Sequence, residues 1–149
     1  LAYAETFLGQ NDKWEAFSNQ QAGKTVCYIG SEPTEMRGKY KKRGARYAMV
    51  THRPSEKRLN VVSIKAGYRY KAGSEVTVVI GKYRFKLFTA DGWAFAYDSK
   101  ADDTLVKAMK RGVEMIVKGI SSRGTSTTDR YSLKGFPAAY RTIGRACKL

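Results

Sequence analysis

Residues 112–147 of the chain, GVEMIVKGISSRGTSTTDRYSLKGFPAAYRTIGRAC, contain the signals that decide the fold. The stretch opens with apolar residues that alternate with charged ones, the period of a strand with one buried face: Val113, Met115 and Val117. The residues 121–124, SSRG, predict a turn, because a glycine adopts positive φ readily. Residues 125–133 are rich in Thr and Tyr and predict the partner strand.

A helix is expected directly after this strand pair, over about residues 136–147. Pro137 stands in its first turn, where a missing backbone N–H removes no intrahelical hydrogen bond. The apolar residues recur at i, i+3, i+4, i+7 and i+11, which is one face of a helix: Phe136, Ala139, Tyr140, Ile143 and Cys147. Cys147 is therefore expected to face the core.

Upstream of this region, the chain consists mainly of short apolar segments separated by turn residues. Gly81 and Lys82 form a two-residue hairpin signal with glycine first. The polar residues 32–44 predict a connector. Strands are expected at 13–18, 24–30, 45–52, 59–66, 75–80, 83–89 and 93–97.

A second short helix is expected over about residues 98–111. Ser99 is a candidate N-cap with Asp102 three residues later, as in a capping box. Leu105, Ala108 and Met109 form its apolar stripe, and a glycine ends it at position 112. Many short antiparallel strands with two small helices predict an all-β fold, an antiparallel β-sandwich.

The length of 149 residues is typical of one domain that buries a sizeable core. We expect residues 13–149 to form it and residues 1–12 to be an N-terminal tail. The opening LAYAE, residues 1–5, resembles the junction left when a signal peptide is removed; an arbitrary start of the chain is the alternative. No apolar run has the length of a membrane span, so no transmembrane segment is expected.

Two cysteines, Cys27 and Cys147, lie near opposite ends of the chain. An even pair in an exported protein favours a disulfide, and two unrelated buried thiols are the alternative. The cysteines and the single histidine, His52, fall short of the four ligands of a structural zinc site. Neither a metal nor a cofactor is expected.

The chain carries 28 Lys and Arg against 13 Asp and Glu, a net charge of +15, which favours polyanionic partners. The densest cluster is RGKYKKRGAR at residues 37–46, where two glycines predict a mobile loop. Arginine binds phosphate, sulfate or carboxylate bidentately, and tyrosine stacks on bases or sugars. A solvated loop that aids solubility is the alternative interpretation. The candidate polyanion-binding residues are Arg37, Lys39, Tyr40, Lys41, Lys42, Arg43 and Arg46.

A second basic feature lies in the strand expected at residues 83–89. Lys82, Arg84 and Lys86 alternate, so they share one face of the strand and form a basic ridge. The ridge either extends the cluster at 37–46 or is only the solvated face of the sheet, the interpretation that we favour. The opposite face is expected to be core: Tyr83, Phe85 and Leu87.

The sequence gives little support for catalysis. Any Ser-His-Asp arrangement must use His52, because it is the only histidine. The glycine-flanked serines at 121, 122 and 126 lack the strand–G-x-S-x-G–helix context of a nucleophile elbow. Asp102 and Asp103 are explained by the start of a helix, where carboxylates complement the dipole. We expect no catalytic residues and no enzymatic activity.

Several short motifs resemble, in order and spacing, those of the invasion-associated locus B family of alpha-proteobacterial envelope proteins. The resemblance covers the chain from Trp14 to Cys147. One departure concerns the cysteines: many relatives have a further cysteine where this chain has Phe17 and Ser18, so the family does not imply a Cys27–Cys147 pair. The motifs are Trp14 followed by Cys27, THRP at 51–54, VVSI at 61–64, AMKRG at 108–112, RGT at 123–125 and YSLKGF at 131–136.

The resemblance implies an immunoglobulin-like β-sandwich, export, and a role in bacterial entry into host cells, with no catalytic residues. We therefore expect an exported protein of the periplasm, outer membrane or cell surface of a Gram-negative bacterium. Its expected role is to assist invasion or colonisation by binding polyanions of the host-cell surface or the envelope. Peripheral association with a membrane is compatible with this role, and no specific binding of nucleic acid is expected. A periplasmic accessory or chaperone-like protein without a host ligand is the alternative.

Overall fold

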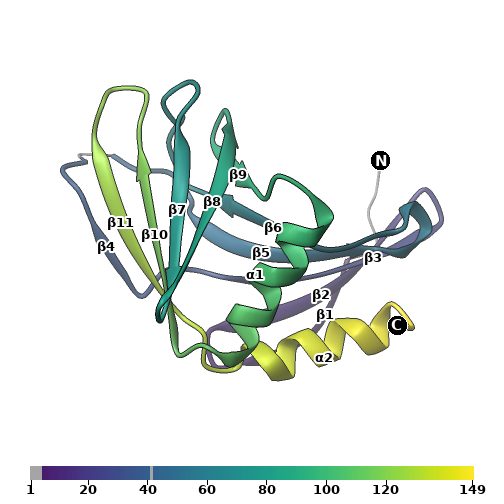
Figure 1. Cartoon of the computed structure of the whole chain (residues 1–149). Helices are drawn as coiled ribbons and strands as arrows, with labels where there is room; N and C mark the ends of the chain where they lie inside the picture. The colour runs from purple at the N-terminus through teal and green to yellow at the C-terminus, as the bar shows by residue number, and fades with distance from the viewer. Residues whose placement is uncertain (1–4, 41) are drawn as a thin grey trace.

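The computed structural model describes residues 5–40 and 42–149 (Figure 1). In these residues 11 antiparallel strands form one continuous sheet, with two short α-helices. The sheet order is β1-β2-β3-β5-β6-β9-β8-β7-β10-β11-β4. The predicted mostly-β class is confirmed. Where two separate sheets were expected, a single sheet curves strongly and its two halves give a sandwich-like fold.

The elements follow the predicted segments closely. One half of the sheet contains β1 (Thr6–Asn11), β2 (Trp14–Gln21), β3 (Lys24–Ser31), β5 (Tyr47–Arg53) and β6 (Arg58–Lys65). The other contains β9 (Trp93–Phe95), β8 (Tyr83–Ala90), β7 (Glu75–Ile80), β10 (Glu114–Ile120), β11 (Ser126–Ser132) and β4 (Glu35–Arg37). The helices are α1 (Ser99–Arg111) and α2 (Phe136–Ala146), and a short 3-10 helix, η1, spans Pro54–Glu56.

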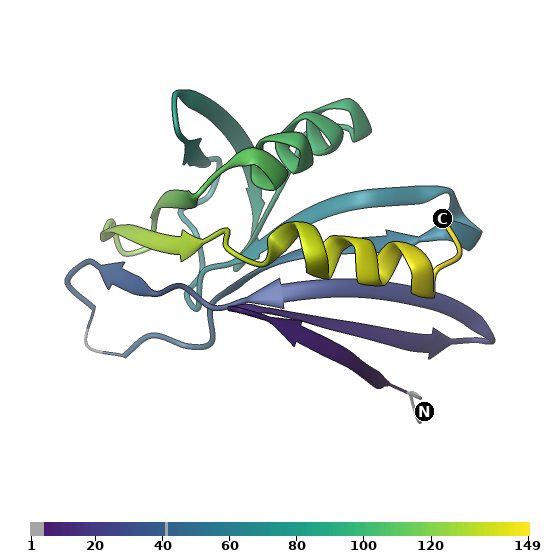
Figure 2. The same ribbon diagram turned by 90° about the horizontal axis from the view of Figure 1, so that it is seen from below.

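The two edge strands of the sheet were not predicted. Residues 6–11, expected within an N-terminal tail, form β1 and pair with β2. Residues 35–37, expected within a connector, form β4 and pair with β11. Because β3 and β5 are neighbours in one half of the sheet, the chain crosses to the far edge and returns between them. Strand β4 therefore lies in one half of the sheet, while the strands that precede and follow it in the chain, β3 and β5, lie in the other half (Figure 2).

The helices lie on the same side of the sheet and enclose the core (Figures 1 and 2). The predicted apolar face of α2 is confirmed, since Phe136, Ala139 and Ile143 are buried. Phe136 meets the ring of Trp14 edge-on at 5.0 Å. At the end of α2, Cys147 forms a disulfide with Cys27 on β3, which confirms the proposed bridge.

The start of α1 differs from the prediction in its cap. The carboxylate of Asp98 accepts a hydrogen bond from the Ala101 N–H at 2.8 Å, so Asp98 is the N-cap and Ser99 is the first helical residue. Asp102 turns into the protein, where its carboxylate accepts from the Val62 N–H on β6 at 2.9 Å. It therefore ties the helix to the sheet and is not part of a capping box.

The buried position of Asp102 predicts a specific pH dependence of stability. Burial raises the pKa of Asp102 to about 6, opposed by the Val62 hydrogen bond and reinforced by the charge of Asp103. An unfolded aspartate has a pKa near ~3.9. Between these values the folded state binds the extra proton, so stability falls as pH rises from about 4 to about 6. We expect Asp102→Asn to remove roughly 1–2 kcal/mol of this decline.

Urea unfolding of the native protein and of Asp102→Asn, at steps from pH 4 to pH 7, measures the difference directly. The comparison cancels other groups, including His52, whose pKa is lowered by burial and which therefore acts in the opposite direction. Asp103→Asn, in an exposed position beside Asp102, is the control and retains most of the decline. The prediction would be contradicted if the free energy of unfolding changed with pH in the same way in the native protein and in Asp102→Asn.

Two predictions about buried strand faces were wrong in part. Val113 precedes β10 and is 83% exposed, whereas Met115 and Val117 are buried as expected. On β8, Leu87 is buried, but Tyr83 is 56% exposed and Phe85 is half-buried. These apolar side chains lie beside the C-terminal end of α1, which covers only part of the sheet there.

Candidate functional site

The basic cluster at residues 37–46 does not act as one loop. Lys41 lies outside the described residues. Arg37 belongs to β4 and is exposed, as are Lys39 and Lys42 in the segment that follows. The ring of Tyr40 stacks on Tyr68 at 5.3 Å, with 14° between the ring planes. One face of Tyr40 is therefore already covered by the protein.

Arg43 points into the protein. Its guanidinium donates two hydrogen bonds to the carboxylate of Asp129 on β11, at 2.7 and 2.6 Å, and its Nε donates to the Ala66 carbonyl at 2.8 Å. The two side chains are only 9% and 5% exposed. Burial alone lowers the pKa of Arg43, but the hydrogen bonds and charge of Asp129 outweigh it and leave the pKa raised. The structure gives Arg43 an internal partner, in contrast to the exposed position expected for it.

Two glycines of this segment, Gly38 and Gly44, lie in close contact with neighbouring backbone. Gly44 donates its N–H to the Gly67 carbonyl at 2.8 Å, and a Cβ on Gly67 would lie 2.4 Å from the Gly44 carbonyl oxygen. A Cβ on Gly38 would lie 2.9 Å from the Ser126 carbonyl oxygen. Arg46 donates to the Gly44 carbonyl at 2.7 Å and to the Arg43 carbonyl at 3.2 Å, both within the same segment.

The outer side of the β8-β7-β10-β11-β4 half collects cations from four strands. Directly paired residues of antiparallel strands point to the same face. One row of such pairs runs through Lys86, Thr77, Lys118, Thr128 and Arg37, and the next through Arg84, Val79, Ile116, Arg130 and Glu35. We call this surface the basic face and define it by Arg37, Arg84, Lys86, Lys118 and Arg130.

The basic face joins two features that were predicted separately. The ridge on β8 and the start of the 37–46 cluster lie at opposite ends of the same rows, because β4 pairs with β11. Lys82, predicted in the ridge, lies in the β7–β8 turn with its ammonium 5.5 Å from the ring centre of Tyr83. The sequence reasoning missed Lys118 and Arg130, and only the strand register shows that they belong here.

Part of the charge on the basic face is already paired. Arg37 contacts Glu35 at 2.6 Å, and Arg130 contacts Glu114 and, at 3.6 Å, Glu35. Within the described part of the chain, the other three cations, Arg84, Lys86 and Lys118, have no carboxylate within 4.0 Å. A shallow depression of about 360 Å³ is lined by Glu35, Arg37, Ile116, Lys118, Thr128 and Arg130.

His52, the only histidine, is built into the core. Its Nδ1 accepts a hydrogen bond from the Asn60 N–H at 3.0 Å, and its ring meets Tyr140 of α2 edge-on at 5.5 Å. Burial, and then the charge of Lys110, lowers its pKa, which favours a neutral ring. Ser121, one of the serines considered above, accepts from the backbone N–H groups of Arg123 and Thr125 with its hydroxyl. These side chains therefore stabilise a strand pair and a turn.

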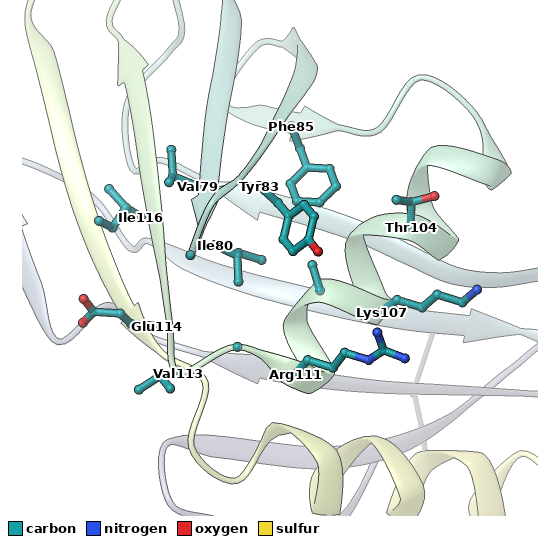
Figure 3. Close-up of a pocket in the computed structure, with 13 residues that line it drawn as sticks. Val79, Ile80, Tyr83, Phe85, Thr104, Lys107, Arg111, Val113, Glu114 and Ile116 are labelled. Carbon is teal, nitrogen blue, oxygen red and sulfur yellow. The ribbon is translucent and has the colours of Figure 1, made fainter.

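A second candidate site is an apolar cleft of about 560 Å³ beside α1 (Figure 3). It lies between the C-terminal half of α1, the start of β8 and the start of β10. Tyr83 and Phe85 contribute aromatic rings from β8, and Lys107 and Arg111 contribute cations from α1. No residue pattern in the sequence predicted this cleft, since Tyr83 and Phe85 were expected to be covered.

Among the described residues, neither helix has the length and apolar character needed to cross a membrane. Searches of curated proteins and of solved structures gave no significant match. The family model described as "Invasion associated locus B (IalB) protein" matches residues 14–144, which is most of the chain. The matched range contains every strand except β1, and both the basic face and the cleft. The chain therefore belongs to the invasion associated locus B family.

Proposed function

We propose that the protein is an exported, non-enzymatic envelope or surface protein that assists host-cell invasion by binding polyanions through the basic face. Membership of the family supports an invasion-associated envelope protein. The observation that carries the finer proposal is the array of Arg84, Lys86 and Lys118, which have no carboxylate within 4.0 Å among the residues described. The disulfide agrees with export, because such bonds persist in oxidising compartments.

The geometry of the basic face favours a polymer over a small anion. Lys86 and Lys118 lie on strands that are separated by β7, which places them roughly 10 Å apart at the usual strand spacing. A single phosphate or sulfate contacts one of them, whereas a chain of anionic groups contacts several together. Because these contacts are exposed, salt screens them over a distance of about 8–10 Å. Binding should therefore weaken steeply as ionic strength rises.

The absence of enzymatic activity is part of the same proposal. Its support is that the side chains considered for catalysis have structural partners: His52 with Asn60 and Tyr140, and Asp102 with Val62. Neither group is exposed. Incubation with ester, peptide and glycoside substrates should show no turnover that His52→Ala abolishes.

Charge reversal on the basic face is expected to weaken polyanion binding at physiological salt. Each exposed contact contributes roughly 0.5–1 kcal/mol, so Arg84→Glu/Lys86→Glu/Lys118→Glu should weaken binding by about tenfold or more. The measurement uses heparin as a defined sulfated polymer, over a salt series, and then cultured host cells. The control Lys100→Glu/Arg141→Glu/Lys148→Glu makes the same charge change at exposed positions outside the basic face and should retain most of the binding.

Three results would contradict this proposal. The first is no salt-sensitive binding of the native protein to heparin or to cells. The second is an equal loss in the control, which would mean that only net charge matters. The third is a loss of binding in Lys39→Glu/Lys42→Glu while the basic-face variant still binds, which would move the site to the segment after β4. In the first case, a periplasmic accessory or chaperone-like role becomes the function to test.

A further inference from the structure

The cleft beside α1 exposes apolar side chains that a protein surface normally covers. Val113 and Tyr83 are 83% and 56% exposed and lie on opposite sides of the cleft, with Phe85 half-buried above Tyr83 (Figure 3). Further apolar lining comes from Ala108 of α1, Val79 and Ile80 of β7, and Ile116 of β10. Contiguous exposed apolar surface of this kind marks sites of interaction.

The cleft exists because two strands and a helix separate at this point. Strand β10 pairs with β7 only from Ile116, opposite Val79, so residues 113–115 diverge from residues 80–81. Helix α1 ends at Gly112, whose close packing on Ile80 leaves no room for a Cβ, which would lie 2.5 Å from the Ile80 methyl group. The helix is thus held near the bottom of the cleft and leaves its upper part open. The volume of about 560 Å³ falls in the ordinary range for small-molecule sites.

The unpaired charged groups that line the cleft are cationic. Lys107 and Arg111 lie one helical turn apart on α1 and point to the same side of it (Figure 3). In the residues that the structure describes, neither has a carboxylate within ion-pair distance. The acid that lines the cleft, Glu114, is already engaged by Arg130. An apolar floor with an unpaired cationic rim is complementary to an anionic amphiphile.

We propose that this cleft binds a medium-chain fatty acid. The alkyl chain lies on Ile80, Phe85 and Val113, and the carboxylate lies between Lys107 and Arg111. Arginine binds a carboxylate bidentately, and a lysine one turn away adds a second charge. The cleft borders the basic face at Val79 and Ile116, but none of the five cations that define the basic face lines it. Phe85 points to the side of the sheet that the helices cover, whereas Arg84 points to the other side. Variants of Lys107 and Arg111 therefore test this site separately from polyanion binding.

Calorimetric titration of the purified protein with sodium decanoate, below its micelle concentration, tests the proposal. We expect saturable binding of one decanoate per chain, about tenfold weaker binding of decanol, and no binding of acetate. Decanol retains the alkyl chain without the charge, and acetate retains the charge without the chain. Equal affinity for decanoate and decanol, or no saturable binding of decanoate, would overturn the proposal.

Two variants separate the contributions of charge and apolar surface. Lys107→Gln/Arg111→Gln should lower decanoate affinity about tenfold, to that of decanol, and leave decanol binding unchanged. The control Lys100→Gln/Arg141→Gln makes the same charge change at exposed positions outside the cleft and should bind as the native protein does. An equal loss in the control would overturn the assignment of Lys107 and Arg111.

Ala108→Trp places a large ring in the cleft and should abolish binding of both ligands. Circular dichroism and the thermal midpoint show whether this variant is folded; if it is not, the two charge variants decide the question. A second copy of the chain is the competing occupant. A dimer seen by sedimentation velocity that Ala108→Trp dissociates, with no decanoate binding, would assign the cleft to self-association and overturn the proposal.

Discussion

Replacement of both cysteines by alanine is expected to lower the free energy of unfolding by about 4 kcal/mol. The bond joins Cys27 on β3 to Cys147 at the end of α2, 120 residues apart in sequence. In the chain-entropy model, a cross-link that closes so long a loop removes much of the freedom of the unfolded chain. Cys27 is fully buried and Cys147 nearly so, which makes alanine a better replacement than serine, whose hydroxyl would lack a partner.

Urea unfolding of the native protein, of Cys27→Ala/Cys147→Ala and of the reduced native protein measures the effect. The reduced protein and the double variant should lose similar amounts of stability, because both release the same loop. Hydrogen exchange should rise most in α2, which packs on β1, β2 and β3 and is followed directly by the cross-linked Cys147. A loss below about 1 kcal/mol would show that core packing holds α2 without the bridge.

The elements that depend on local pattern were predictable from the sequence. The apolar stripe of α2 repeats with the helical period within a few residues, so Phe136 and Ile143 could be assigned to the core directly. The Gly81–Lys82 turn was equally clear, since it joins two apolar strands in the hairpin of β7 and β8. The cap of α1 was placed one residue late, because Asp98 and Ser99 are both good caps and only the geometry selects the first.

The edge strands were not predictable because their partners are distant in sequence. Strand β4 contains three residues, EMR at 35–37, and owes its conformation to pairing with β11. Strand β1 has a register shift between Phe7 and Gly9, which breaks the two-residue alternation that identifies a strand. Both edges carry few buried side chains, so hydrophobic periodicity gives them little signal.

The candidate site was hard to predict for the same reason, because contacts between residues distant in sequence decide which side chains are exposed. Arg37 and Arg43 stand six residues apart in one basic cluster, yet Arg37 lies on the basic face and Arg43 is buried on the other side of the sheet. One signal for this division was present in the sequence. Asp129 and Tyr131 stand two residues apart in one strand, so they point to the same face, and Tyr131 is buried there. A charged residue that faces the core requires a charged or polar partner. The folded structure shows that this partner is Arg43, from the segment between β4 and β5.

Loss of the Arg43–Asp129 pair is expected to destabilise the protein about as much as loss of the disulfide. Asp129→Asn should lower the free energy of unfolding by about 3–5 kcal/mol, because it leaves the guanidinium of Arg43 buried without its counter-charge. The pair also fastens the segment between β4 and β5 to β11, so its loss frees the return of the chain from one half of the sheet to the other. Burial protects this pair from screening, and its contribution should change little with salt.

The matched control is Asp91→Asn, in the Arg69–Asp91 pair at 3.1 Å, whose side chains are 72% and 80% exposed. An exposed pair contributes roughly 0–1 kcal/mol, so the two Asp→Asn changes should differ by at least about 2 kcal/mol in urea unfolding. Combining Asp129→Asn with Arg43→Met removes both charges and should cost less than the sum of the single changes, because no isolated charge stays buried. Additive losses, or equal losses at Asp129 and Asp91, would mean that Arg43 reaches solvent and would restore it as a candidate polyanion contact.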